Sequence, residues 1–229
     1  AIGYMIQQSL QNALYKKESE REVATFISQM KINRDDPSLK KPTKYIGKTY
    51  SKEKAHKLSE KYGWDILEQE KGEWRRVVPS PNPSYIFNGK SIKHLVEFGT
   101  IVIAGGGGGI PAYNSKDGVL KGIDGVVDKD KTAALLGRII RANEYFIITD
   151  VDNIYLNYNT DSEEKIDVAT VSQIKEWLDE GHFGIGSMEP KIKSALYFLK
   201  HHGDKVVITS IRKLEEAIAG KAGTQIIKD

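Results

Sequence analysis

Five consecutive glycines, Gly105 to Gly109, directly follow the apolar run 101–104. Glycine loses more backbone freedom on folding than any other residue, so such a run is unfavourable unless something must come close to the backbone. Backbone amides at the exit of a strand can hold a phosphate or another small anion. A second backbone segment, or a tight strand exit without any ligand, are the alternatives. The run does not match a Walker loop, because no Gly-Lys-Ser/Thr follows it.

Two further segments place charged or polar groups at the expected ends of a helix and a strand. Residues 128–130 read Asp-Lys-Asp just before a predicted helix. An ammonium held between two carboxylates is an ordered positive charge, which suits a transferring phosphoryl group. A solvated charge cluster that caps the helix is the alternative. The strand predicted at 145–149 ends in Thr149-Asp150, which suits a ribose or a magnesium-bound phosphate, or equally a turn.

The glycine-rich segment 181–187 leads into a helix predicted at 190–202, with Lys191 in the first helical turn. Cations are disfavoured near a helix N-terminus, so Lys191 indicates an anionic ligand in front of this helix. His182 in the same segment could instead be structural. The letters GKAGT at 220–224 superficially match a phosphate-binding loop, but no long helix follows them, and we discount this match.

The composition is that of an ordinary globular protein. Of the 229 residues, 39% are hydrophobic and 28% are charged. The net charge of +3, from 34 basic and 31 acidic residues, indicates neither a nucleic-acid nor a membrane partner. Cysteine is absent, which excludes disulfides and thiolate chemistry and suits a reducing cytosol. No apolar run approaches the ~20 residues of a membrane helix.

Alternating helix and strand patterns predict an α/β sheet covered on both faces, with ligands at the carboxyl ends of its strands. Apolar residues about four apart predict a helix over 2–16 with one buried stripe, and the β-rich segment 23–32 predicts a strand. Further helices are predicted at 51–63, 91–98, 131–143, 171–180, 190–202 and 211–219, and further strands at 100–104, 145–149 and 206–210.

A polar, proline-bounded stretch interrupts this pattern and predicts a subdomain over 33–84 with its own small sheet. Within it, Ser51 is expected to cap a helix that Gly63 ends. The stretch beginning EWRRVV is expected to be an edge strand stopped by Pro79. The predicted domains are therefore the remainder of an N-terminal lobe at 1–32, the subdomain at 33–84 and an α/β lobe at 85–229.

Taken in order, the segments GGGGIP, VVDKD, TDVDN, GHFxxGSMxPK, ITS and GKAGTxI resemble carbamate kinase, of the amino-acid kinase superfamily. PTKYIG (42–47) and WRRVVPSPNP (74–83) resemble the protruding subdomain that sets carbamate kinases apart from other amino-acid kinases. The resemblance covers essentially the whole chain. It implies a three-layer αβα sandwich with a mainly parallel sheet and a small protruding subdomain. It also implies a cytoplasmic homodimer, with the 85–229 lobe binding the nucleotide.

The resemblance implies reversible phosphoryl transfer between ATP and carbamate, giving carbamoyl phosphate and ADP, commonly run toward ATP in arginine fermentation. It places Lys129 at the transferring phosphoryl group, with Asp130 orienting the lysines, Lys191 beside the terminal phosphates and Lys44 on the subdomain that closes over the site. Gly106 to Gly109 would wall the small acceptor site. Magnesium is expected to bind through the phosphates, without direct protein ligands. The residues placed in the nucleotide pocket are Thr149, Asp150, Tyr155, Met188 and Lys191.

The chain departs from the family pattern at its start. The family begins with a strand, a Gly-Gly-Asn loop and a loop holding His-Gly-Asn-Gly, and these precede the residues that match Ala1 onward. A molecule that starts at Ala1 is therefore expected to bind adenine nucleotide weakly and to make no ATP. One alternative is another phosphotransferase of this fold, such as a UMP or acetylglutamate kinase, against which Lys44 and residues 74–83 argue. The other is an inactive nucleotide-binding fragment.

Overall fold

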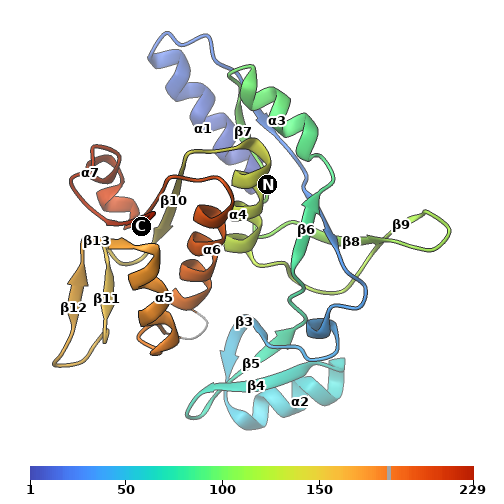
Figure 1. The fold of residues 1–229 in the computed structure, drawn as a ribbon. Helices are drawn as coiled ribbons and strands as arrows, with labels where there is room; N and C mark the ends of the chain where they lie inside the picture. Colours follow the sequence, from blue (N-terminus) through green and yellow to red (C-terminus); the bar gives the residue numbers. More distant parts are fainter. Residues whose placement is uncertain (185–186) are drawn as a thin grey trace. The chain divides into compact units, whose positions relative to one another are not determined.

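The computed structural model describes residues 1–184 and 187–229 (Figure 1). The chain forms two compact units, Ala1–Thr132 and Ala133–Asp229, and the division falls within helix α4 (Lys129–Ile140). Both units contain helices and strands. Within the described ranges, no helix combines the length and the apolar character that crossing a membrane requires.

Two small sheets form the body of the first unit. In one, β1 and β7 pair in parallel. The other has the order β6-β2-β8-β9, in which β2 and β8 run parallel and the remaining pairs antiparallel. The predicted strand 23–32 is thus split in two, because its halves pair in different sheets. The bounds are β1 Val23–Thr25, β2 Gln29–Ile32, β6 Pro83–Ile86, β7 Ile101–Ile103, β8 Ile110–Asn114 and β9 Leu120–Gly122.

Helices α1 (Ile2–Lys16) and α3 (Gly89–Glu97) pack beside β7 in the first unit (Figure 1). The range of α1 agrees with the prediction, but its apolar stripe is not buried: no residue of α1 is buried, and Ile2 is 73% exposed. The half-buried side of the helix combines Leu10 and Leu14 with the polar Gln7, to whose Oε1 the Thr25 hydroxyl of β1 donates over 2.7 Å. The strand predicted at 100–104 is likewise only half-buried, since its sheet has two strands.

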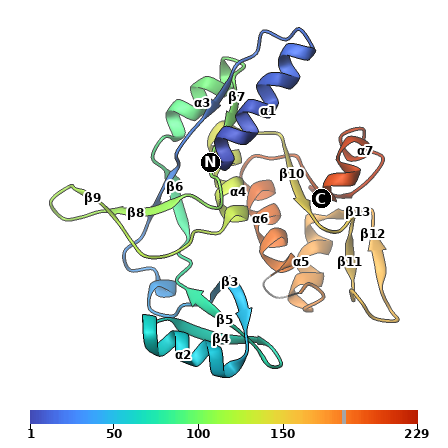
Figure 2. The same ribbon diagram turned by 180° about the vertical axis from the view of Figure 1, so that it is seen from behind.

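A third sheet in the first unit, of order β3-β5-β4, is wholly antiparallel and packs against helix α2 (Figure 2). Strand β5 is its centre, so the edge position predicted for this stretch is wrong; β5 pairs on both sides and ends before Pro79. Gly63 ends α2 with a left-handed φ of 66°, as predicted, whereas the Ser51 side chain makes no capping bond. The bounds are β3 Lys44–Tyr50, α2 Lys52–Tyr62, β4 Asp65–Glu70 and β5 Glu73–Val78, with a short 3₁₀ turn, η1, at Pro37–Leu39.

The second unit is built on a sheet of order β10-β14-β15-β13. Strands β10 and β14 run parallel, as do β13 and β15, whereas β15 runs antiparallel to β14. All residues from Val206 to Ser210 of β14 are buried, so helices cover both faces of this strand. The bounds are β10 Glu144–Thr149, β11 Ile154–Leu156, β12 Glu164–Ile166, β13 Val168–Thr170, α5 Val171–Asp179, α6 Met188–His201, β14 Lys205–Ser210, η2 Ile211–Lys213, α7 Leu214–Ile218 and β15 Thr224–Ile227.

The core of the second unit centres on Phe198 of α6, which is fully buried. A Cβ added at Gly203 would lie 1.9 Å from the ring, and one added at Gly137 would lie 2.7 Å from it, so two glycines give this ring its space. Helix α6 packs on β10 and β14, α5 on β13 and β15, and α7 on β14. The other large core side chains include Ile147, Ile154, Ile174, Ile192, Val206, Ile208 and Ile226.

Candidate functional site

The glycine run connects β7 to β8 in the first unit. Four of its members have φ angles in the left-handed region: Gly105 (80°), Gly106 (51°), Gly108 (133°) and Gly109 (84°). Residues with a Cβ rarely adopt these angles, so the turn depends on glycine. A Cβ at Gly108 would in addition lie 1.8 Å from the carbonyl oxygen of Val127.

The two halves of the run serve different purposes. A Cβ at Gly109 would lie 2.6 Å from Met30 Cγ, so Gly108 and Gly109 are required for close packing against the protein itself. At Gly106 and Gly107, an added Cβ would meet no atom within 4 Å, and both residues are exposed. Close approach of another backbone therefore explains Gly108, while Gly106 and Gly107 remain open to a ligand.

Two buried hydroxyl groups hold the run in place. Ser28 Oγ accepts a hydrogen bond from the Gly105 amide over 2.8 Å. Thr132 Oγ1 in α4 donates to the Gly108 carbonyl oxygen over 2.7 Å. These bonds, together with the packing of Gly108 on Val127, fix the run against the segment that enters α4.

Helix α4 begins at Lys129, two residues earlier than predicted, so Asp128 is the residue that precedes the helix. Asp128 Oδ1 accepts from the amides of Asp130 (2.9 Å) and Lys131 (3.4 Å). The carboxylate thereby satisfies two amides that have no partner within the helix and complements the positive end of the helix dipole. The helix-cap role that the sequence left as an alternative thus belongs to Asp128.

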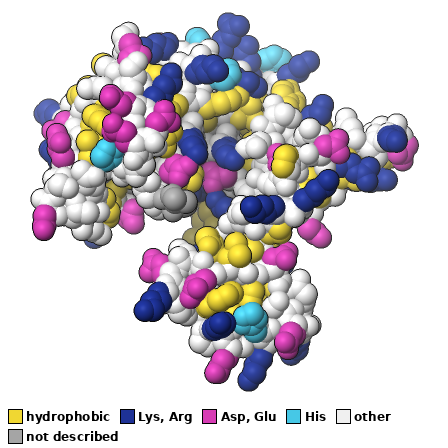
Figure 3. All heavy atoms as spheres, turned by 60° about the horizontal axis from the view of Figure 1, so that its bottom comes forward, with side chains coloured by type: hydrophobic (Ala, Val, Ile, Leu, Met, Phe, Trp, Pro, Cys, Tyr) yellow, Lys and Arg dark blue, Asp and Glu magenta, His cyan; other side chains and the backbone are white. Residues whose placement is uncertain are grey.

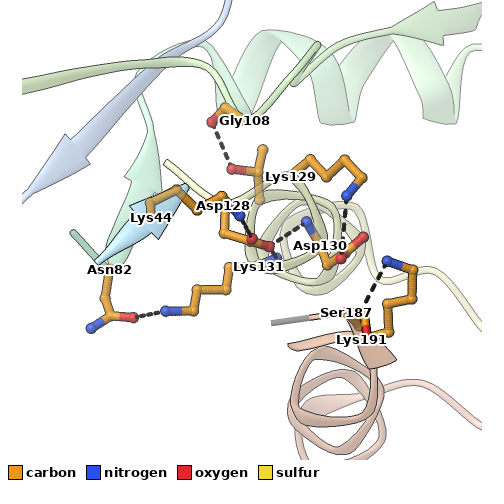
Figure 4. Close-up of polar contacts among 10 residues, drawn as sticks. Lys44, Asn82, Gly108, Asp128, Lys129, Asp130, Lys131, Ser187 and Lys191 are labelled. Carbon is orange, nitrogen blue, oxygen red and sulfur yellow. Dashed lines mark hydrogen bonds and ion pairs between the residues drawn. The ribbon is translucent and has the colours of Figure 1, made fainter. Parts of the chain in front are cut away.

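The carboxylates of Asp128 and Asp130 pair with different lysines (Figure 4). Lys129 Nζ lies 3.5 Å from Asp130 Oδ2, and its side chain is 57% exposed. Lys44 Nζ forms a hydrogen-bonded ion pair with Asp128 Oδ2. The sequence predicted that the Lys129 ammonium would be held by both carboxylates. The structure instead shows two separate ion pairs, Lys44 with Asp128 and Lys129 with Asp130.

Lys44, which pairs with Asp128, is the first residue of β3. Burial of Asp128 by itself would raise the pKa of its carboxyl group. The Lys44 ammonium and the amides of Asp130 and Lys131 outweigh this effect, and the pKa lies below its ordinary value of 3.8. Asp128 therefore carries its negative charge in a place that is only 5% exposed.

The second unit contains a cavity of about 800 Å³, a size suited to a small organic ligand. Strand β10 ends at its rim with Thr149, and α6 begins at its opposite wall with Met188. All five residues that the sequence placed in a nucleotide pocket line this one cavity: Thr149, Asp150, Tyr155, Met188 and Lys191.

In Figure 3, basic and acidic side chains are interspersed over the face shown, in keeping with the small net charge.

Lys191 is the fourth residue of α6, which starts at Met188 and so two residues before the predicted start. Its Nζ lies 3.5 Å from the carbonyl oxygen of Ser187 (Figure 4), and Lys191 is one of the residues that line the cavity. Residues 185–186 of the GHFxxGSMxPK motif lie outside the described residues.

The cavity also contains His182, which the sequence left between a structural and a ligand-related role, and Tyr158, to which the sequence assigned none. His182 contacts Asn157 Oδ1 (2.9 Å) through Nδ1 and Glu180 Oε2 (3.0 Å) through Nε2, and so joins two walls of the cavity. Tyr155 and Tyr158 contribute neighbouring rings, with centroids 5.7 Å apart. A spacing of three between two tyrosines after TDVDN was the available signal, but the β11–β12 hairpin, with Tyr155 in β11 and Tyr158 in the connection to β12, was not predicted.

The GKAGT segment is structural, in agreement with its dismissal above. The buried Thr224 hydroxyl donates to the Ile166 carbonyl oxygen and accepts from the Ile154 amide. It therefore ties the β11–β12 hairpin to β15, while Gly220 and Gly223 supply the left-handed turns between α7 and β15.

Comparisons with known proteins agree with this arrangement. The sequence profile of the amino acid kinase family matches residues 24–210. Carbamate kinase of Staphylococcus epidermidis is 42% identical over 228 residues, which cover 99% of this chain and 74% of that protein. Carbamate kinase of Pyrococcus furiosus is 41% identical over 226 residues, covering 99% and 72%. A solved structure of carbamate kinase from Giardia lamblia bound to AMP-PNP superposes with a TM-score of 0.87 at 34% identity, over 100% of this chain and 72% of that one.

The chain belongs to the carbamate kinases, within the amino acid kinase family. The α/β fold class predicted from the sequence is thereby confirmed, as is the class of enzyme, a phosphotransferase.

Proposed function

We propose that this protein transfers a phosphoryl group reversibly between ATP and carbamate, giving carbamoyl phosphate and ADP. The support comes from relatives at 41–42% identity that are carbamate kinases, together with the start of α4. Phosphoryl transfer needs little covalent help, and positive charge around the transferring oxygens does most of the work. Lys129, with Asp130 beside it and the open glycines nearby, offers such a charge.

The observation that carries the proposal is the split character of the glycine run. Gly106 and Gly107 leave room that no side chain fills, next to backbone that Gly108 fixes against Val127. Carbamate has almost no bulk to bind by, so a site for it must be formed by backbone at close range. We assign the acceptor site to the open half of the run, with Lys44 and Lys129 as the cations that act on the transferring group.

We assign the nucleotide, ATP or ADP, to the cavity of the second unit. Its aromatic and apolar residues Tyr155 and Met188 suit a base, Asp150 suits a ribose, and Lys191 suits the terminal phosphates. The relative from Giardia lamblia binds the ATP analogue AMP-PNP. We propose that magnesium joins the complex through the phosphate oxygens, where it would neutralise part of their charge.

The wider setting of the reaction is proposed from the family resemblance. We propose a homodimer that works in the cytoplasm and runs toward ATP as the last step of arginine fermentation. The same resemblance supports the division into residues 1–32, 33–84 and 85–229, and the 33–84 segment contains a sheet of its own. Sedimentation at micromolar concentration tests the dimer, for which a monomer would be the contrary result.

An acceptor screen tests the proposed activity. The protein expressed from its full reading frame is given Mg-ATP with carbamate, UMP or N-acetylglutamate, and ADP formation is measured. We expect ADP with carbamate alone. Transfer to UMP or to N-acetylglutamate would assign the chain to another activity of the same fold. Binding of ADP without transfer to any acceptor would make it a nucleotide-binding module.

A further inference from the structure

We propose that Asp128 is a positioning residue: it docks the Lys44 ammonium at the start of α4, one residue away from Lys129. The proposal rests on the proposed function and extends it by assigning Asp128 to Lys44, a lysine on a distant segment, in place of its sequence neighbour Lys129. Lys44 belongs to the 33–84 segment, and the buried Asp128 carboxylate fixes the position of its ammonium group.

The two oxygens of Asp128 have separate tasks. Oδ1 accepts from the amides of Asp130 and Lys131, and Oδ2 accepts from Lys44 Nζ. The amide bonds come from the helix itself, so they hold the carboxylate in one orientation whether or not Lys44 is present. The Asp128 side chain is 7% exposed, while the Lys44 side chain is 33% exposed. We therefore infer that the Asp128 carboxylate keeps its position and that the Lys44 side chain moves to meet it.

A second contact ties the 33–84 segment to the same turn of α4. Lys131 Nζ donates to Asn82 Oδ1 over 2.6 Å, and the Asn82 amide donates to Asp36 Oδ2 over 2.9 Å (Figure 4 shows the first of these). Asp36 lies where the chain enters the segment and Asn82 where it leaves. The two connections of the segment to the body are thus bonded to each other, and Asn82 is bonded to Lys131, three positions after Asp128. These bonds anchor the base of the segment beside the carboxylate that pairs with Lys44.

The ion pair leaves Lys44 able to act on an anion. An ammonium group has three N–H donors, and the bond to Asp128 uses one of them. A lysine side chain loses rotamer freedom when it is held against a substrate, which costs free energy. Because the bond to Asp128 already restricts the Lys44 side chain, this cost is paid before the substrate binds. Since a buried carboxylate without a counter-charge is unfavourable, Asp128 also favours the position of the segment in which Lys44 is present.

A labelling experiment tests the docking without relying on activity. Lysines of the protein are acylated under limiting reagent, and the rates at Lys44 and Lys48 are compared by mass spectrometry. Lys48 lies on the same strand and is exposed, which makes it the matched control. Asp128→Asn keeps an oxygen for the two amides but removes the charge. We expect the acylation rate at Lys44 to rise about tenfold in this variant, which corresponds to the stabilisation lost with one hydrogen bond to a charged group. The acylation rate at Lys48 should not change.

An unchanged Lys44 rate in folded Asp128→Asn would overturn the proposal. If the variant does not fold, the wild-type protein decides, because docking requires Lys44 to react more slowly than Lys48, and equal rates would contradict it. If the wild-type protein proves inactive with carbamoyl phosphate, the proposed function fails, while the labelling result still decides whether Asp128 docks Lys44.

A double-mutant cycle then tests the role in turnover. Asp128→Asn and Lys44→Met should each lower kcat about tenfold or more with little change in KM for ADP, because both disturb a cation that acts on the transferring group. The double variant should fall no lower than Lys44→Met, since Asp128 acts through Lys44. Losses that multiply would show that Asp128 acts as a helix cap only and would overturn its positioning role.

Discussion

At the start of α4, the functional groups are charges set on backbone that glycines and the Asp128 cap hold in place. In the cavity of the second unit, the aromatic and apolar side chains of Tyr155, Phe183 and Met188 lie among a larger number of polar side chains. Fixed charges act most strongly on a group whose charge distribution changes during the reaction, whereas a preformed cavity binds a ligand before the reaction starts. Substitutions at the site in the first unit should therefore lower turnover, and substitutions in the cavity of the second unit should lower nucleotide affinity.

The largest effect is expected at the packed half of the glycine run. Gly108→Ala forces a Cβ against the Val127 carbonyl oxygen at a φ of 133°, and should lower the free energy of unfolding by about 3 kcal/mol or more. Gly107→Ala is the matched control, because it meets no atom within 4 Å and has no left-handed φ. Urea unfolding measures both variants.

Gly107→Ala should change the unfolding free energy by less than about 1 kcal/mol and yet lower kcat/KM for carbamate, because its methyl group enters the proposed acceptor site. A Gly107→Ala enzyme with normal kcat/KM would remove the open half of the run from that site. Equal unfolding curves for both variants would contradict the division of the run into two halves.

Lys129→Ala should lower kcat about 100-fold, because removal of one donor that stabilises a transferring group usually raises the activation free energy by about 3 kcal/mol. The Kd of ADP should change little, because this lysine is assigned to the transferring group and not to the bound nucleotide. Steady-state kinetics and calorimetric titration of ADP give the two quantities. Lys116→Ala, in the exposed β8–β9 turn, is the control, and a variant that loses ADP affinity instead of turnover would place Lys129 with the nucleotide.

The opposite pattern is expected in the second unit. Tyr155→Ala should raise the Kd of ADP about tenfold, as loss of one aromatic contact to a base does, while kcat at saturating ADP stays near that of the wild-type enzyme. Tyr15→Ala on α1, which is 71% exposed, serves as the control. A fall in kcat with unchanged affinity would break the separation of roles between the units.

The smallest effect concerns pH. The pKa of Asp128 lies below 3.8 in the folded protein, so the stabilisation it provides is complete above that value and is lost as the pH falls through the folded pKa. Asp128→Asn should therefore make the free energy of unfolding less dependent on pH between about pH 5 and pH 2. Asp117→Asn, in the exposed β8–β9 turn, is the control. The same pH dependence in Asp128→Asn and wild type would contradict this account of the ion pair.

The sequence predicted elements well where one segment decides its own structure. Gly63 and the periodic patterns of α1 and α4 to α6 gave helices within a few residues of those observed. The predictions from the sequence were wrong where the structure of a segment depends on the strands or helices that lie beside it. The central place of β5, the break in 23–32 and the exposed stripe of α1 depend on which strands lie alongside, and short-range patterns do not carry that information.

The same limit applies to the candidate site. The motifs named Lys44, Lys129, Lys191 and the nucleotide-pocket residues, because the ordered set resembles one family. They did not show that Gly108 is needed for packing while Gly107 faces open space, nor that Asp128 pairs with a lysine 84 positions away. Such contacts arise only when distant segments meet.

Formation of ATP from carbamoyl phosphate and ADP is the measurement that tests the central claim most directly. The protein expressed from its full reading frame is mixed with magnesium, ADP and carbamoyl phosphate, and ATP is followed by luminescence, with acetyl phosphate as the alternative donor. We expect ATP from carbamoyl phosphate at rates typical of kinases, roughly 1–100 per second, and a loss of about 100-fold in Lys129→Ala. A folded protein that binds ADP but makes no ATP, or makes it equally well from acetyl phosphate, would contradict the account.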